Sequence, residues 1–168
     1  DVSNPTGPHL WTNLNATLQL AQFYPGISIH PSDEQVGMGG TQDNDTLKFE
    51  DSLNWEQVGP GCDGGYTVID RTVPSTWFFT CQGGIIFRSV VNGAPDSYTL
   101  AIDGIDFSDL VAFIAPIIGD PNVPDRLYFG TSRIYQTNDG AQNWVAISPD
   151  LTASLASLRA IAVAPSDS

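Results

Sequence analysis

Short runs in which apolar and polar residues alternate are the dominant pattern of this chain. The runs are four to seven residues long, rich in Ile, Val, Phe, Tyr and Thr, and bounded by Gly, Pro, Asp or Asn. Such runs predict half-buried β-strands joined by turns. No long stretch carries an apolar stripe at helical spacing, and residues 151–158 could hold one helical turn at most. The pattern therefore predicts an all-β protein.

A motif of tryptophan, two intervening residues and an apolar residue recurs at an almost fixed period. It begins at Trp11, Trp55 and Trp144, which are 44 and then 89 residues apart, close to one and two periods. Near residue 99, where the missing copy should fall, Tyr98 supplies an aromatic residue ahead of alternating apolar positions. Repeats of this length built from short strands indicate a β-propeller, in which each repeat forms one four-stranded blade.

Two further markers keep the same period. A Gly-Thr pair at residues 40–41 returns at residues 130–131, 90 positions later, and the glycine-rich residues 82–84 lie near the midpoint. The apolar-alternating stretch 27–33 returns as 161–167, a shift of 134 residues or about three periods. The repeat therefore extends over most of the chain, and we expect residues 1–168 to form a single propeller segment.

The strand signals divide into three complete blades, at about residues 25–60, 61–104 and 105–149. The expected strands are, in order, 27–30, 35–41, 46–50 and 55–58; then 66–70, 77–81, 85–89 and 98–102; then 110–115, 126–130, 132–137 and 144–147. We expect the repeated aromatic residues, Trp55, Tyr98 and Trp144, to wedge near the outer strands.

Both ends of the chain carry parts of further blades. Residues 10–14 are expected to be the outermost strand of a preceding blade, and residues 158–164 the innermost strand of a following one. Three blades cannot close a ring, because propellers use four or more, and bare strand edges invite association. We therefore expect the chain to be a fragment or subunit of a larger propeller, completed by other blades or by further copies of the chain.

Charge narrows the choice of partners. The chain holds 6 Lys and Arg against 19 Asp and Glu, a formal net charge of −13. This balance disfavours nucleic acid and anionic membrane surfaces, which bind through Lys and Arg. No run of 18 apolar residues is present, so no membrane span is expected. The acidic balance is compatible with Ca²⁺, with neutral glycans or with solubility outside the cell.

The two cysteines of the chain indicate the cellular compartment in which the protein works. Cys62 and Cys81 are 19 residues apart on what should be neighbouring strands of one blade, so they form either a disulfide or two buried thiols. The chain opens on Asp1 rather than Met, as a processed or excised piece would. Together with the all-β composition, this favours a secreted, extracellular or cell-surface protein.

The sequence of residues 137–144, Thr-Asn-Asp-Gly-Ala-Gln-Asn-Trp, resembles an Asp-box, the Ser/Thr-x-Asp-x-Gly-x-Thr-Trp turn of sialidase-like propellers, also called BNR repeats. Thr137, Asp139, Asn143 and Trp144 fit the pattern, while Ala141 stands where glycine is preferred. The resemblance implies that the Asp139 carboxylate accepts backbone N–H groups between the third and fourth strands of a blade, with Trp144 packed beneath as a wedge.

A second resemblance covers about residues 11–168. The stretch 40–46, the tryptophan at position 55 and the stretch 62–70 are similar to a pattern in large secreted bacterial proteins. Those proteins carry BNR, YVTN or VPS10-sortilin-like propellers and are often described as glycosyl hydrolases. The usual pattern has glycine where this chain has Asp45 and Cys62. Asp-boxes are architectural, so the resemblance implies a fold and leaves the function open.

The best candidate site is an acidic cluster made of Asp43, Asn44, Asp45 and Asp63. Glycine-rich loops of a propeller gather near one face, so these oxygens could converge on a hard cation such as Ca²⁺. The spacing is not that of an EF-hand loop, and no bidentate Glu is present. The alternative is that Asp43 and Asn44 cap a tight turn through bonds from side chain to backbone. No cofactor other than Ca²⁺ is expected.

A catalytic role is the other possibility for this cluster. Asp43 and Asp63 could act as general acid and base in glycoside hydrolysis. Sialidase chemistry also needs an arginine triad and a tyrosine nucleophile, and the chain has only five arginines, of which Arg133 is expected to lie in a strand. The motifs that can be recognised are structural. We therefore expect a non-catalytic extracellular scaffold or binding module for a glycan or protein; the alternative is a glycoside hydrolase-type propeller.

Overall fold

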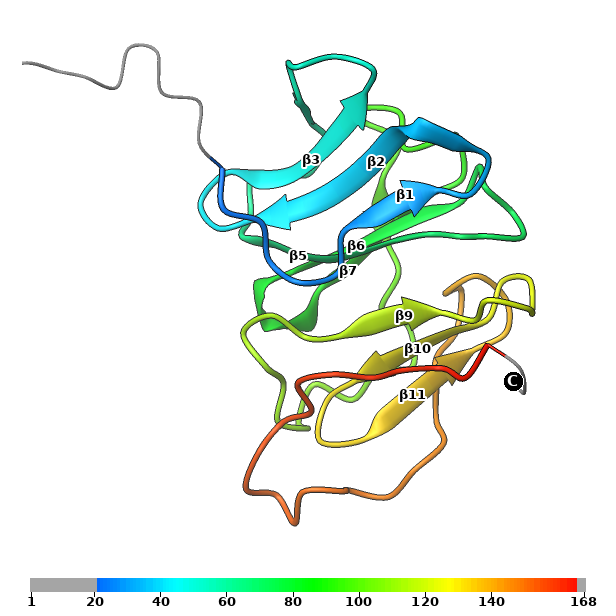
Figure 1. The fold of residues 1–168 in the computed structure, drawn as a ribbon. Helices are drawn as coiled ribbons and strands as arrows, with labels where there is room; N and C mark the ends of the chain where they lie inside the picture. Colours follow the sequence, from blue (N-terminus) through cyan, green and yellow to red (C-terminus); the bar gives the residue numbers. More distant parts are fainter. Residues whose placement is uncertain (1–20, 166–168) are drawn as a thin grey trace, which may run out of the picture.

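The computed structural model describes residues 21–165, which fold into three separate four-stranded antiparallel sheets (Figure 1). Within this range there is no α-helix, and the short 3₁₀ turn η2 (Gln82–Gly84) is the helical element that follows the sixth strand. No helix of the described residues is therefore long and apolar enough to cross a membrane. The predicted all-β class is confirmed.

In each sheet four consecutive strands pair in sequence order. The first sheet contains β1 (Ser28–His30), β2 (Asp33–Thr41), β3 (Asp45–Glu50) and β4 (Glu56–Gln57). The second contains β5 (Gly64–Ile69), β6 (Trp77–Cys81), β7 (Ile86–Ser89) and β8 (Thr99–Leu100). The third contains β9 (Ile117–Gly119), β10 (Leu127–Gly130), β11 (Ile134–Thr137) and β12 (Val145–Ala146). The outer strands have two residues each, which leaves little edge for pairing with another chain.

The second sheet is buried on both faces, and its central strand β6 shows how. Alternate residues of a strand point to opposite faces. Trp77 and Phe79 pack toward the first sheet in one apolar cluster, whereas Phe78 packs toward the third sheet in the other. All three side chains are at most 1% exposed. A continuous apolar run is therefore required here, as for any strand covered on two sides.

The first strands of the three sheets gather on one side of the molecule. Parts of β1, β5 and β9 line a common cavity of about 450 Å³, to which Ile161 and Val163 also contribute. Sheets that stack face to face with their first strands at a common centre form the blades of a β-propeller. The three sheets of the described residues do not close a ring.

The prediction that residues 110–115 form the inner strand of the third blade is wrong. The strand β9 instead begins at Ile117, and its register pairs that residue with Phe129. Residues 110–115 belong to the connection that precedes it: Ala112 and Ala115 are buried in the core. The Phe113 carbonyl accepts the Gly83 N–H at 2.9 Å. This run is apolar because it covers the core, and such a run has the same composition as a buried strand.

Two flanking strands were predicted, one at each end of the chain, and the structure describes only the second of these segments. Residues 10–14 lie outside the described residues. Residues 158–164 are described and contain no strand. The Leu158 N–H donates to the Thr131 carbonyl at 2.7 Å, and Ile161 and Leu158 lie over Gly130, where a Cβ atom would be 3.0 and 3.2 Å from them. A strand needs a ladder partner on a neighbouring strand, and the described residues provide none for this segment.

Candidate functional site

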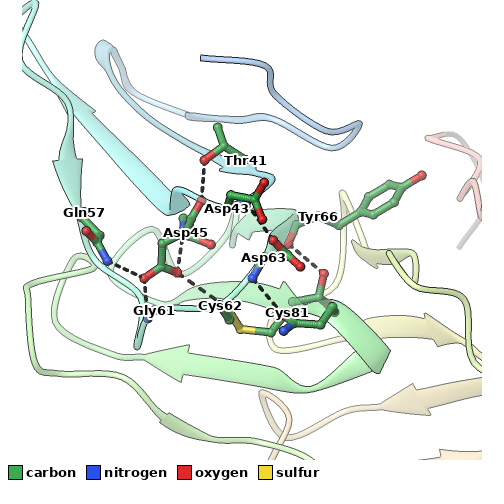
Figure 2. The surroundings of a disulfide bond; sticks show 12 residues. Thr41, Asp43, Asp45, Gln57, Gly61, Cys62, Asp63, Tyr66 and Cys81 are labelled. Carbon is green, nitrogen blue, oxygen red and sulfur yellow. Dashed lines mark hydrogen bonds between the residues drawn. A yellow bond between two sulfur atoms is a disulfide. The ribbon is translucent and has the colours of Figure 1, made fainter. Parts of the chain in front are cut away.

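A disulfide between Cys62 and Cys81 organises the loops that carry the acidic cluster (Figure 2). Cys62 lies in the connection from the first sheet to the second, and Cys81 ends β6; their Cα atoms are 5.8 Å apart. The residues that follow the two cysteines bind each other. The Asp63 N–H donates to Gln82 Oε1 at 2.8 Å, and the Gln82 N–H donates to the Asp63 carbonyl at 3.0 Å. The disulfide thus holds two loops in a fixed relation.

Asp63 and Asp43, 20 residues apart, are brought into direct contact. Asp63 Oδ1 accepts the Asp43 N–H at 2.7 Å, from the turn that joins β2 to β3. Asp43 adopts a φ of 60°, and the Asn44 side chain donates to the Gln42 carbonyl at 2.9 Å. Asn44 therefore bonds the backbone of its own turn, while the Asp43 amide is held by a carboxylate from the next blade.

Asp45 is the most buried member of the cluster, with 1% of its surface exposed. Its Oδ1 accepts the Thr46 N–H at 2.8 Å and lies 3.5 Å from the Cys62 sulfur. Its Oδ2 accepts the Gln57 side-chain amide at 3.0 Å and the Gly61 N–H at 2.7 Å. A buried carboxylate is costly unless it is hydrogen-bonded, so these donors are what allow it to stay inside.

The backbone at position 45 has a conformation that favours glycine. Asp45 has a φ of 68°, in the left-handed region that glycine adopts most easily. The Thr41 hydroxyl donates to the Asp45 carbonyl at 2.8 Å and holds this conformation. The aspartate side chain offsets the strain by connecting the turn to the β4–β5 connection.

A groove of about 640 Å³ runs along this cluster. Its lining combines the carboxylate and amide groups with one aromatic side chain, and includes Asp43, Asn44, Asp45, Asp63, Gln57, Gln82 and Trp55. Among residues 21–165, no three His, Cys, Asp or Glu side chains come together as metal ligands would. Both Asp45 oxygens already accept protein donors. The arrangement has the polar groups and aromatic wall that a small polar ligand would use.

The turn between β11 and β12 is organised around Asp139. The Thr137 hydroxyl donates to Asp139 Oδ1 at 2.7 Å, and the same oxygen accepts the N–H groups of Gln142 and Asn143 at 2.9 and 3.0 Å. Partial burial by itself would raise the pKa of Asp139, but the hydrogen bonds from Thr137, Asn143 and Gln142 outweigh it and lower the pKa below its ordinary value. Ala141 has a φ of 65°, the conformation expected of the preferred glycine.

Three wedge residues were expected near the outer strands. Trp144 is 2% exposed in the core between the second and third sheets. Tyr98 packs on Phe79 with ring centroids 4.8 Å apart, and burial raises its pKa above the ordinary range. Trp55 differs, because 38% of its surface is exposed.

Sequence reasoning missed a pair of turns with the pattern Asp-x-x-Val-Pro. Asp70 Oδ1 accepts the N–H groups of Thr72 and Val73 at 2.8 and 2.9 Å. Asp120 Oδ1 accepts those of Asn122 and Val123 at 2.9 and 3.1 Å. Asp70 also accepts the Asp125 N–H at 3.2 Å and so connects the second blade to the third. The signal was present as a second copy of the pattern 50 residues along the chain.

A second missed group involves the arginine that was expected in a strand. Arg133 lies in the turn before β11 and pairs with Asp109 at 3.2 Å. Asp109 Oδ2 also accepts the Tyr135 hydroxyl at 2.7 Å. Burial, followed by this hydrogen bond, raises the pKa of Tyr135, which is 2% exposed. A tyrosine so enclosed and protonated is poorly placed to act as a nucleophile.

No family model and no curated protein matches this chain. Among solved structures, YCF48 from Cyanidioschyzon merolae, a β-propeller, superposes with a TM-score of 0.56 and 16% sequence identity. The match covers 76% of this chain and 37% of the YCF48 chain. This chain therefore has a β-propeller fold and spans little more than a third of the length of that relative.

Proposed function

We propose that the chain is a non-catalytic scaffold or binding module of a larger extracellular propeller. The observation that carries the proposal is the bond from the Asp43 N–H to the Asp63 carboxylate. A glycosidase needs two carboxyl groups that flank a substrate, with a gap between them. Here Asp63 binds the backbone of Asp43 itself, so the pair connects two blades.

The turn at residues 137–144 belongs, in this proposal, to the Asp-box kind found in sialidase-like propellers. Its support is the set of N–H groups that the Asp139 carboxylate accepts and the burial of Trp144 beneath the turn. Such a turn stabilises the end of a blade and performs no chemistry. We therefore propose a sialidase-like propeller architecture for this chain and no sialidase activity.

The disulfide supports the extracellular assignment, since disulfides persist mainly in oxidising compartments. The partners we propose are the remaining blades of the ring together with a protein or a neutral glycan. An anionic glycan fits less well, because the groove lining contains three Asp side chains and no Lys or Arg.

A glycoside hydrolase is the second candidate, favoured by the position of Asp43 and Asp63 on one groove. The two candidates are separated by measuring binding and turnover of a panel of neutral glycans with the intact protein. The variants are Asp43→Ala and Asp63→Ala, with the exposed Glu34→Ala as the matched control. We expect no turnover in any of them. Turnover that disappears in both Asp variants while the melting temperature is kept would establish the enzyme instead.

A further inference from the structure

A pocket of about 360 Å³ lies at the junction of the second and third blades. It is lined by Arg88 of β7, by Leu100 of β8 and Asp103 after it, and by Gln142 and Asn143 from the turn between β11 and β12. None of its described lining residues belongs to the groove beside Trp55. Both blades are complete within residues 21–165, so the walls of this pocket do not depend on the rest of the ring.

Arg88 is directed into this junction by the alternation of β7. Its register places it between Phe78 of β6 and Thr99 of β8. Ile86, two residues earlier, packs in the apolar cluster shared with the third sheet, and alternate strand residues point to the same face. A Cβ atom on Gly140 would lie 3.3 Å from Arg88 Nη2, so the guanidinium reaches the β11–β12 turn of the next blade.

The Arg88 guanidinium has no partner within the described residues. Its Nε atom is buried and donates no hydrogen bond, and no described carboxylate forms an ion pair with it. Asp125 Oδ1 would lie 3.0 Å from the same Cβ position on Gly140, yet it does not pair with Arg88. The other partly buried or buried cations of the described chain each have a carboxylate: Lys48 has Glu50, Arg126 has Asp120 and Arg133 has Asp109. Because an unpaired charge away from bulk water is costly, Arg88 is suited to a partner from outside the chain.

Asp103 brings the opposite charge to the same pocket. Its main-chain carbonyl accepts the Trp144 N–H at 2.8 Å, which fixes its segment against the third blade. The residue is exposed, and its carboxylate has no hydrogen bond or ion pair with the described part of the chain. The Gln142 and Asn143 side-chain amides each use one N–H for Asp139, at 2.9 and 3.3 Å, and each keeps a second N–H. The pocket thus presents a cation and an anion that do not pair with each other, together with amide donors.

We propose that this pocket binds a small zwitterion of the α-amino acid type. The carboxylate of the ligand accepts from the planar Arg88 guanidinium, which matches a carboxylate through parallel hydrogen bonds, and the ammonium group faces Asp103. An apolar side chain of the ligand lies along Leu100, which is 61% exposed. This is a further binding site, separate from the scaffold role and from the groove beside Trp55.

Charge and size favour a zwitterion over a simple anion in this pocket. The net charge of −13 repels a free anion, whereas a zwitterion carries no net charge. The Asp103 carboxylate also repels an anion but attracts the ammonium group of an amino acid. The pocket volume is at the lower end of the range for small-molecule sites, as a ligand of this size requires.

The test is an NMR titration of the full chain that follows the Arg88 side-chain Nε–H resonance, assigned by its disappearance in Arg88→Lys. The probe is L-leucine. The matched probes are isocaproate, which lacks the ammonium group, and isopentylamine, which lacks the carboxylate. We expect leucine to shift the resonance saturably and each matched probe to bind at least ~10-fold more weakly, because each loses a charge-assisted hydrogen bond.

Variants separate the two charges. Asp103→Asn should weaken leucine binding at least ~10-fold and leave isocaproate binding equal or stronger. The matched control is Asp96→Asn, which should change neither affinity: Asp96 is exposed, does not line the pocket and has a φ of 59°, which asparagine tolerates. Both positions are exposed, so both variants should keep the melting temperature. Arg88→Lys keeps the positive charge but loses the planar fork, and calorimetry should show weaker leucine binding.

Three results would overturn the proposal. The first is the absence of a saturable shift with leucine. The second is equal affinity for leucine and isocaproate that ignores Asp103→Asn, which identifies a site for simple anions. The third is an equal loss of leucine binding in the Asp103 and Asp96 variants. Glycan and protein binding is measured separately with the Asp43 and Asp63 variants, so this site can fail while the proposed scaffold role stands.

Discussion

Trp144 donates its indole N–H to the main-chain carbonyl of Ala101 at 2.9 Å and so connects the third blade to the second. The side chain is 2% exposed, and its ring lies 6.0 Å from that of Phe129. The Trp144 main-chain N–H donates in addition to the Asp103 carbonyl at 2.8 Å. One residue thus provides an apolar wedge and two hydrogen bonds to a segment that ends the preceding blade.

Trp144→Phe tests this connection. The variant keeps an aromatic wedge but leaves the buried Ala101 carbonyl without its donor, which should lower the free energy of unfolding by about 1–3 kcal/mol. Val145→Ala, at the next position on β12 and 64% exposed, should change it by less than about 0.5 kcal/mol. Urea denaturation of both variants provides the comparison. Equal stabilities would show that the hydrogen bond contributes nothing.

Asp139→Asn tests the electrostatics of the β11–β12 turn. The pKa of Asp139 is lowered in the folded state from an ordinary value of 3.8. A carboxylate of this kind stabilises the protein above its unfolded pKa, and the contribution is lost as the pH falls through the folded pKa. The wild type should therefore be more stable than the variant at neutral pH, and the gap should close below about pH 4. A gap that does not change with pH would contradict this.

Removal of the disulfide with Cys62→Ala and Cys81→Ala should lower the free energy of unfolding by about 3 kcal/mol, because the unfolded chain regains the freedom of a closed loop. The Asp63–Gln82 contact beside it should loosen as well, visible as faster exchange of the Asp63 amide. Wild-type protein under a reducing agent is the matched sample, and its melting temperature should equal that of the double variant. An unchanged melting temperature on reduction would rule out a stabilising disulfide.

Asp45→Ala should be among the more destabilising changes in the acidic cluster. It leaves the Gly61 N–H and the Gln57 amide without their acceptor in a buried place, at a cost of about 2–3 kcal/mol. Asp43→Asn is the matched control, because Asp43 is exposed and asparagine tolerates its left-handed φ of 60°, so the change should cost less than about 0.5 kcal/mol. Chemical denaturation distinguishes the two. Similar losses at both positions would mean that Asp45 is not the internal connection described above.

Addition of Ca²⁺ tests the hypothesis that the acidic cluster binds a metal ion. A ligand that binds the folded state raises stability with its concentration. Since Asp45 is occupied by protein donors, millimolar CaCl₂ or EDTA should change the free energy of unfolding by less than about 0.5 kcal/mol. A stabilisation that grows with CaCl₂ and disappears in Asp43→Ala would instead establish a metal site on Asp43, Asn44 and Asp63.

The strand pattern was largely readable from the sequence because it depends on local properties. Alternating apolar residues bounded by turn residues located β2, β6 and β10 to within two residues. The inner strand β9 was misplaced because residues 110–115 are as apolar as a strand. Only packing shows that this run covers the core, while the strand begins after Pro116.

The candidate site was harder to predict from the sequence. Sequence grouped Asp43, Asn44, Asp45 and Asp63 because they are short acidic or amide residues in glycine-rich loops. It could not assign Asp45 to the interior or Asp63 to the Asp43 amide, since both depend on hydrogen bonds between residues 12 to 20 positions apart. The Asp-x-x-Val-Pro turns were missed because their copies are 50 residues apart, which does not match the 44-residue period of the tryptophan motif.

The sequence by itself determined the repeat, the all-β class and the turn around Asp139, since strand alternation and turn chemistry act over a few residues. Tertiary structure alone decided which carboxylates lie inside and which face of each sheet is covered. Burial and long-range hydrogen bonds depend on how whole blades stack, and blade stacking is a property of the assembled chain. Trp55 and Trp144 begin the same motif, yet within the described residues only Trp144 has a neighbouring blade to cover it.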